Sequence, residues 1–334
     1  SREESLKDDL QTWLDWDKTT DETYFDRAGV SLLFYAVCAN HFEAAAFLLT
    51  EINKNFKSDT KERQRRIESR IPKEGFLYVG VQGSNTVLHG AMAFASPAMV
   101  QLLLENGANP YITEVTGSNA LMAACMCNRL DNVNLWLKQF PDWDLESRNT
   151  VVGGIALGCA VFMGPNRFEL AELLLKAGAK IDTLTFSGGS FLTNACENED
   201  ADPQVIRLLL NHGSDIKYRV SATVLKWKLI RQVAKTAVRG FKTSNGLLRY
   251  LAKESGATAL HYAAMRGDME IVELLLSKCA DPSLKNDLGQ DAAAMCTSFP
   301  ELQGVLEKRE RKMKLRGTAK KTKAVEVLGK RIST

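Results

Sequence analysis

The sequence repeats a local pattern at an interval near 33 residues, and this period constrains the fold more than any other feature. The stretch 256–291 reads GATALHYAAMRGDMEIVELLLSKCADPSLKNDLGQD, and its opening G-x-T/D-A pattern at Gly256 returns at Gly289, 33 positions later. Two short antiparallel helices and a hairpin loop fill about 33 residues. The period therefore predicts a stack of such units.

Several fixed offsets in this stretch match one pattern: T-x-L-H at 258–261, A-A at 263–264, G-D at 267–268, I-V-x-L-L-L at 271–276 and A-D-P at 280–282. Thr258 can cap the first helix, and Gly267 permits the left-handed turn that ends it. On these residues the stretch resembles the ankyrin repeat. The resemblance implies an all-α solenoid of stacked helix-turn-helix units with hairpin loops, in which His261 supports the turn between units through hydrogen bonds.

The Thr258 position serves as a marker for counting units. The same local pattern occurs at Ser31, Thr86, Asn119, Ile155, Ser190, Thr223, Thr258 and Asp291. Successive intervals are 33 to 36 residues except the first, which is 55. We therefore expect a solenoid over 29–315 with about eight units, several of them degenerate. We also expect an insertion at 53–81, in which a prolonged second helix is followed by a loop.

The two ends of the chain depart from the period. Residues 1–28 place apolar side chains from Leu6 to Leu14 on one helical face, which predicts a segment that caps the exposed end of the core. Residues 316–334 are polar and basic, and we expect a flexible or partner-ordered tail. No signal peptide is visible in the sequence. Because the sequence begins at Ser1 without a methionine, removal of a presequence is an alternative. No apolar run reaches the roughly 18 residues of a transmembrane segment.

Charge is distributed unevenly along the chain. The segment 216–253 contains ten Lys or Arg residues and no Asp or Glu, and 308–331 contains eleven basic and two acidic residues. The whole chain carries a formal charge of only +3, so the remainder is strongly acidic. Such polarity favours an oppositely charged partner.

The stretch of about 221–242 is expected to form a long basic helix with two faces. Its apolar side would hold Trp227, Ile230 and Ala234, and the adjacent side would hold a cationic stripe. Ordinary solvated helices mix charges of both signs. The stripe could be offset inside the protein, by a neighbouring unit or by the acidic loop 198–202, or by an anionic partner surface, which we favour.

The resemblance implies a partner-binding concave face built from loop tips and first helices. Candidate face residues lie seven or eight positions after a marker or near a loop tip: Phe94, Met126, Phe162, Met163, Arg266, Phe186 and Tyr218. The candidate basic contacts are Lys226, Lys228, Arg231, Lys235, Arg239 and Lys242. Packing between units is the alternative for the apolar members.

Nothing in the sequence indicates catalysis. Two of the four histidines occupy the family's structural position, which leaves no triad. The seven cysteines lack disulfide or zinc spacing, so we expect no metal, and we expect no cofactor and no small-molecule substrate. Most of the thiols are expected to be small buried residues in a reducing compartment.

The sequence therefore predicts a non-catalytic scaffold or adaptor for protein–protein interaction, with an acidic partner surface. The alternative is a polyanion-binding module for RNA, DNA or anionic lipid that uses helix 226–242 and the tail. A third reading is a calmodulin-like target helix at 227–242. We expect a cytoplasmic location, and the alternative is the nucleus, through basic clusters within 308–323.

Overall fold

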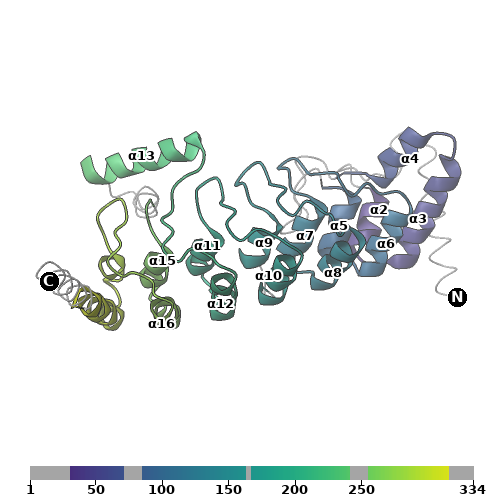
Figure 1. Ribbon diagram of the computed structural model, residues 1–334. Helices are drawn as coiled ribbons and strands as arrows, with labels where there is room; N and C mark the ends of the chain where they lie inside the picture. The colour runs from purple at the N-terminus through teal and green to yellow at the C-terminus, as the bar shows by residue number, and fades with distance from the viewer. Residues whose placement is uncertain (1–30, 71–84, 163–166, 241–254, 316–334) are drawn as a thin grey trace, which may run out of the picture. The chain divides into compact units, whose positions relative to one another are not determined.

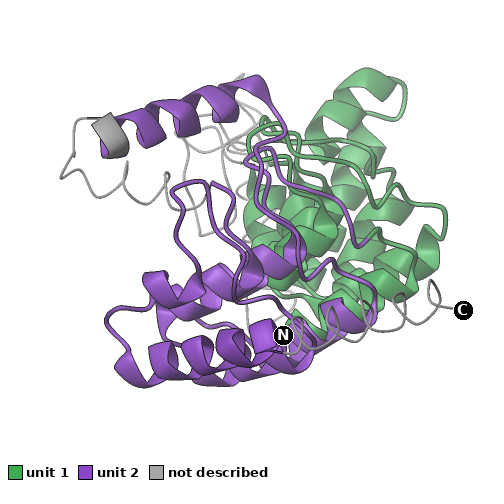
Figure 2. Cartoon of the chain, turned by 60° about the vertical axis from the view of Figure 1, so that its left-hand side comes forward, with its two compact units in different colours: residues 1–180 green, residues 181–334 purple. Residues whose placement is uncertain are grey.

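The computed structural model describes residues 31–70, 85–162, 167–240 and 255–315. Over these ranges the chain is helical, and extended pairing is confined to two isolated bridges, Arg70 with Thr86 and Thr113 with Asn119. The expected all-α class is confirmed. The chain divides into two compact units, residues 1–180 and 181–334 (Figure 2). The predicted capping segment 1–28 and tail 316–334 lie outside the described residues, as do Met163 and Lys242.

Unit 1 is a stack of helix pairs (Figure 1). The pairs are α2 (Leu32–Cys38) with α3 (Phe42–Asn55), α5 (Val87–Phe94) with α6 (Pro97–Glu105), α7 (Ala120–Met126) with α8 (Leu130–Gln139), and α9 (Ala156–Phe162) with α10 (Arg167–Lys176). The first helices pack on one another in chain order. Their many small residues permit this close approach, and the second helices bury apolar faces against them.

The predicted insertion contains a helix of its own. Helix α3 runs to Asn55, and after a short turn Asp59 caps a separate helix, α4 (Thr60–Ile67). With 14 residues against nine in α6, helix α3 is prolonged as expected, but a separate helix follows it where a loop was expected. Glu62 pairs with Arg65 (2.7 Å) and Arg66 (2.8 Å), so one carboxylate is shared by two of the cations and the helix keeps an excess of positive charge.

The marker positions are helix caps. Six of them stand at the N-cap of a first helix: Ser31, Thr86, Asn119, Ser190, Thr258 and Asp291. Each satisfies backbone N–H groups that the first helical turn leaves without partners. The marker therefore has a local physical cause, which explains why the sequence could locate it.

The histidine expected to support the turn does so. Nδ1 of His261 accepts hydrogen bonds from the Thr258 amide (3.1 Å) and hydroxyl (2.8 Å), and Nε2 donates to the Gln290 carbonyl oxygen of the next loop (3.1 Å). His89 makes the same set with Thr86 and with the Ser118 carbonyl oxygen (3.2 Å). Each imidazole ring therefore joins one helix pair to the hairpin loop of the next helix pair. Burial lowers the pKa of His89 to about 4.

Unit 2 repeats the arrangement with a modified middle. It contains α11 (Phe191–Glu197), α12 (Pro203–Asn211), α13 (Leu225–Gly240), α15 (Ala259–Arg266), α16 (Met269–Ser277), α17 (Ala292–Met295) and a C-terminal helix described over 300–315. Helix α15 ends at Gly267, whose φ of 78° is the left-handed conformation expected there. Helix α11 packs directly against α15, and α12 packs against α16.

Helix α13 therefore does not occupy a place in the stack. Figure 1 shows it apart from α11 and α15, on the side of the hairpin loops. In the hairpin before α11, the backbone of Thr185 pairs with that of Gly189, four positions later. In the hairpin before α15, the equivalent backbone pairing joins Val220 to Ala257, 37 positions later. The prediction of a repeat starting at Thr223 is therefore wrong. The residues between Val220 and Ala257, which we call the insert, extend the tip of a hairpin loop by one period. The described residues form seven helix pairs.

Candidate partner-binding surface

Helix α13 is attached to unit 2 through the neighbouring hairpin loop. The Thr223 hydroxyl donates to the carbonyl oxygens of Thr185 (3.1 Å) and Phe186 (3.2 Å), and the Tyr218 hydroxyl donates to the Gly188 carbonyl oxygen (2.9 Å). Phe186 and Tyr218 are half-buried. These two predicted contact residues thus lie where the insert leaves the stack, and their backbone and hydroxyl groups hold it there.

Asp287 lies in the next hairpin loop, before α17, and its side chain contacts the insert. Its carboxylate accepts hydrogen bonds from the Ser255 hydroxyl (2.6 Å), the Lys235 ammonium (3.2 Å) and the Arg219 guanidinium (3.3 Å). Burial opposes ionisation, but the hydrogen bonds from Ser255 and Lys235 and the two positive charges outweigh it and hold the pKa of Asp287 below its usual range. The predicted internal partner of the stripe was the loop 198–202; Asp287 could not be predicted, because it lies 52 positions from Lys235.

The structure divides the predicted cationic stripe. Lys226 and Lys228 are exposed, and Lys235 is half-buried against Asp287. Arg231 is only 3% exposed, so the expectation that it faces a partner is wrong. Burial raises the pKa of Tyr218, and the nearby charge of Arg231 works against that rise. The side chain of Arg239 lies outside the described part. One section of the stripe therefore faces inward, and the lysines of the first turn face outward.

The apolar side of α13 also has two parts. Trp227 and Ile230 are half-buried and Ala234 is buried, as their spacing predicted. A second set, which we call the outer row, consists of Leu225, Leu229 and Val233, with exposed fractions of 69%, 57% and 62%. The outer row was not among the predicted contact residues. Its i, i+4, i+8 spacing was visible, but the inward set has a helical period as well, and the sequence does not say which set meets the protein.

The remaining predicted face residues have different surroundings. Phe162 is 47% exposed and Phe94 is half-buried. Met126 lines a hollow of about 240 Å³ in unit 1, beside the exposed Val151 and Val152. The buried His89 and Glu114 also line this hollow, so its lining combines polar and apolar side chains.

Arg266 holds a loop of unit 2. Its guanidinium donates to the carbonyl oxygens of Glu197 (3.2 Å), Asn198 and Glu199, which follow α11. Three carbonyl oxygens from consecutive residues are a fixed structural partner for a planar guanidinium. The acidic loop that the sequence analysis considered for the cationic stripe is thus bound through its backbone by Arg266.

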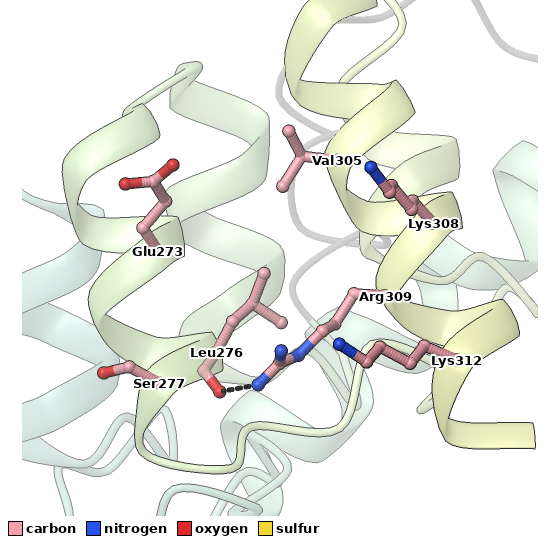
Figure 3. A pocket seen from close by; sticks show the side chains of 7 residues that line it. All are labelled: Glu273, Leu276, Ser277, Val305, Lys308, Arg309 and Lys312. Atoms are coloured by element: carbon pink, nitrogen blue, oxygen red, sulfur yellow. Dashed lines mark hydrogen bonds between the residues drawn. The ribbon is translucent and has the colours of Figure 1, made fainter. Parts of the chain in front are cut away.

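A basic groove lies between α16 and the C-terminal helix (Figure 3). It has a volume of about 390 Å³, and its lining is apolar at Leu276 and Val305 and cationic at Lys308, Arg309 and Lys312. Arg309 donates to the carbonyl oxygen of Leu276 (3.1 Å), which closes one end of α16. Glu273 of α16 also lines the groove, so three cations and one carboxylate face it and the excess charge is positive.

The thiols fit a structural role. Cys125, Cys196 and Cys296 are buried, and burial raises their pKa values. Burial also raises the pKa of Cys38 and Cys159 to about 12, which keeps both thiols protonated at neutral pH. In the part of the chain that the structure describes, no cluster of three or more His, Cys, Asp or Glu residues could hold a metal ion. No helix within the same ranges has the length and apolarity to cross a membrane.

Comparison with known proteins agrees with this architecture. A family model of three ankyrin repeats matches residues 157–286, and a single ankyrin repeat model matches residues 84–114. The B-cell lymphoma 3 protein homolog of Mus musculus is 31% identical over 204 residues, which cover 60% of this chain and 37% of that protein. The chain thus aligns with less than two fifths of that relative's length.

Two solved structures share the fold. The ankyrin repeat domain of Bcl-3, described as a unique member of the IkappaB protein family, has a TM-score of 0.55 and 25% identity, over 84% of this chain and 100% of that one. The ankyrin repeat domain of human ASB11 has a TM-score of 0.55 and 19% identity, over 84% and 98%. With its capped helix pairs and histidine-linked loops, the chain belongs to the ankyrin repeat family and is a protein-interaction repeat module.

Proposed function

We propose that this chain is a non-catalytic adaptor whose partner is a protein with an acidic surface, bound on the hairpin-loop side of unit 2 with α13 as a principal contact. One observation carries the proposal. Lys226 and Lys228 are exposed on a helix outside the stack, in a segment, 216–253, without a single Asp or Glu. Asp287, which does meet this segment, is already shared by Lys235 and Arg219.

The charge supports an anionic partner because an unbalanced positive helix gains most from opposite charge across an interface. Among the described residues no carboxylate lies within ion-pair distance of Lys226 or Lys228. Charge of this kind steers association and sets specificity, and it is weakened by salt.

A protein partner fits α13 better than a polyanion. Nucleic-acid binding uses many phosphate contacts and aromatic side chains on which bases stack. The outward face of α13 has an apolar centre, and Trp227, the aromatic residue of the helix, is turned toward the protein. The repeat family also supports a protein partner. For location we propose the cytoplasm, with the nucleus as the alternative, to be distinguished by imaging fusions with and without residues 308–323.

The test is a paired charge reversal. Lys226→Glu with Lys228→Glu changes the charge of the outer side of α13 while leaving its inward contacts in place, and should abolish recovery of the protein partner from cell extract. The matched control is Lys308→Glu with Lys312→Glu, an equal change on the C-terminal helix. Wild-type recovery should fall steeply with salt. Recovery that is equal in the two double variants, or dominated by nucleic acid, would refute the proposal.

A further inference from the structure

The outer row is an apolar feature for which the fold of unit 2 gives no reason. Leu225, Leu229 and Val233 are each more than half exposed, and they follow one another along one side of α13. Scattered exposed apolar residues are ordinary, but a contiguous set at helical spacing marks an interaction surface. Because α13 already buries an apolar side against the protein, the outer row contributes nothing to that packing.

The spacing of the outer row indicates the shape of what covers it. Residues four apart form the ridge that packs into the groove between side chains of another helix. An interfacial membrane helix instead has a broad apolar face with aromatic residues. On α13 the apolar strip is one ridge wide, and the exposed Gln232 and Thr236 lie beside it. The geometry therefore favours a helical protein segment over a lipid surface.

The flanking charges indicate the chemistry of that segment. Lys226 and Lys228 are exposed, and on a helical projection they lie on opposite sides of the outer row. A second copy of α13 would bring lysines against lysines, which is unfavourable. A helix with an apolar strip bordered by carboxylates would complement both the ridge and the charges.

We propose that α13 is a docking helix whose outer row inserts into the apolar groove of an acidic, amphipathic helical segment of the partner. This inference rests on the proposed function for the sign of the partner's charge and adds the form of the segment that is recognised. In this arrangement the repeat stack holds a helix outward, and the contact surface is convex.

The test uses synthetic helical peptides of equal length as probes, with binding to the full chain followed by fluorescence anisotropy. The first peptide has a leucine strip bordered by glutamate, the second has the same strip bordered by lysine, and the third keeps the glutamates but replaces the leucines with alanine. We expect the first to bind, with an affinity that falls as salt rises, and the other two to bind at least roughly tenfold more weakly.

Variants of the chain locate the site. Replacing the outer row by serine, as Leu225→Ser, Leu229→Ser and Val233→Ser, should remove binding of the first peptide. The matched control is Val151→Ser with Val152→Ser, which removes exposed apolar side chains from unit 1. Circular dichroism should show an unchanged helical content in both, because the replaced side chains are exposed.

Three kinds of result would overturn the inference. No binding of the first peptide, or equal binding to wild type and the outer-row variant, would show that the row is not a docking ridge. Equal binding of the first and third peptides would mean that charge alone acts, in which case the proposed function stands and the docking ridge does not. Row-dependent sedimentation with phosphatidylserine vesicles, or row-dependent self-association, would assign the surface to a membrane or to a second copy.

Discussion

Asp287 is one of the groups that attach α13 to the stack, beside the hydrogen bonds of Thr223 and Tyr218, and Asp287→Asn tests its share. The substitution keeps the shape and an acceptor for the Ser255 hydroxyl, but it removes the negative charge that meets Lys235 and Arg219. Asp287 is 35% exposed and Lys235 is 22% exposed, so solvent screens the pair only in part. A pair of this kind contributes about 1 kcal/mol, and the more exposed Arg219 contact adds a few tenths.

A loss of about 1–1.5 kcal/mol corresponds to a roughly five- to thirteenfold rise in the open population of α13. Hydrogen exchange followed by mass spectrometry should show this rise in peptides from 225–240, while peptides from α11 and α15 keep their protection. The thermal midpoint should hardly change, because α13 lies outside the stack. The lowered pKa of Asp287 also predicts that attachment is complete above pH 4 or so and weakens as pH falls below that value.

The matched control is Asp182→Asn, which removes an exposed negative charge from unit 2 at a distance along the chain from the insert. A Lys235→Met variant completes a double-mutant cycle, and its effect should be non-additive with that of Asp287→Asn. If exchange in 225–240 is unchanged in Asp287→Asn, or if the control changes it as much, the carboxylate does not hold the helix.

Two further predictions concern the stack. Leu275 is fully buried in α16, so Leu275→Asp should cost several kcal/mol, read as a lower urea midpoint, whereas Glu273→Ala on the exposed side of the same helix should cost little. An unchanged midpoint would place Leu275 outside the core. Because the pKa of buried His89 is about 4, below the unfolded value near 6.5, the stability of unit 1 should be complete above pH 6.5 and fall toward pH 4, by up to about 3 kcal/mol. His89→Gln should flatten this dependence, and an unchanged slope would refute the assignment.

The local parts of the fold could be predicted because short-range chemistry produces them. A capping residue such as Thr258 and its partner His261 are three positions apart, so the hydrogen bonds they make are encoded within one turn. The same holds for Gly267, which ends α15 in the left-handed conformation that glycine adopts without a steric penalty. The count of residues between such signals gave the period, and the period gave the stack.

The candidate surface could be predicted only in part. The sequence located the basic helix and its apolar side around Trp227, because both follow from a helical period. It did not distinguish the inward side from the outward one, since Leu225 and Leu229 have the same period as Trp227 and Ile230. Burial of Arg231 and the contact of Lys235 with Asp287 depend on a hairpin loop far along the chain.

The sequence by itself determined that this chain is a stack of capped helix pairs with a strongly basic helix near its C-terminal third. Only the tertiary structure decided that this helix stands outside the stack. The insert adds one period between Val220 and Ala257, so counting along the chain cannot separate it from a repeat unit. Contacts between residues far apart in the chain make the difference. Helix α15 buries its apolar face on α11, whereas α13 is held at the tip of the hairpin loop.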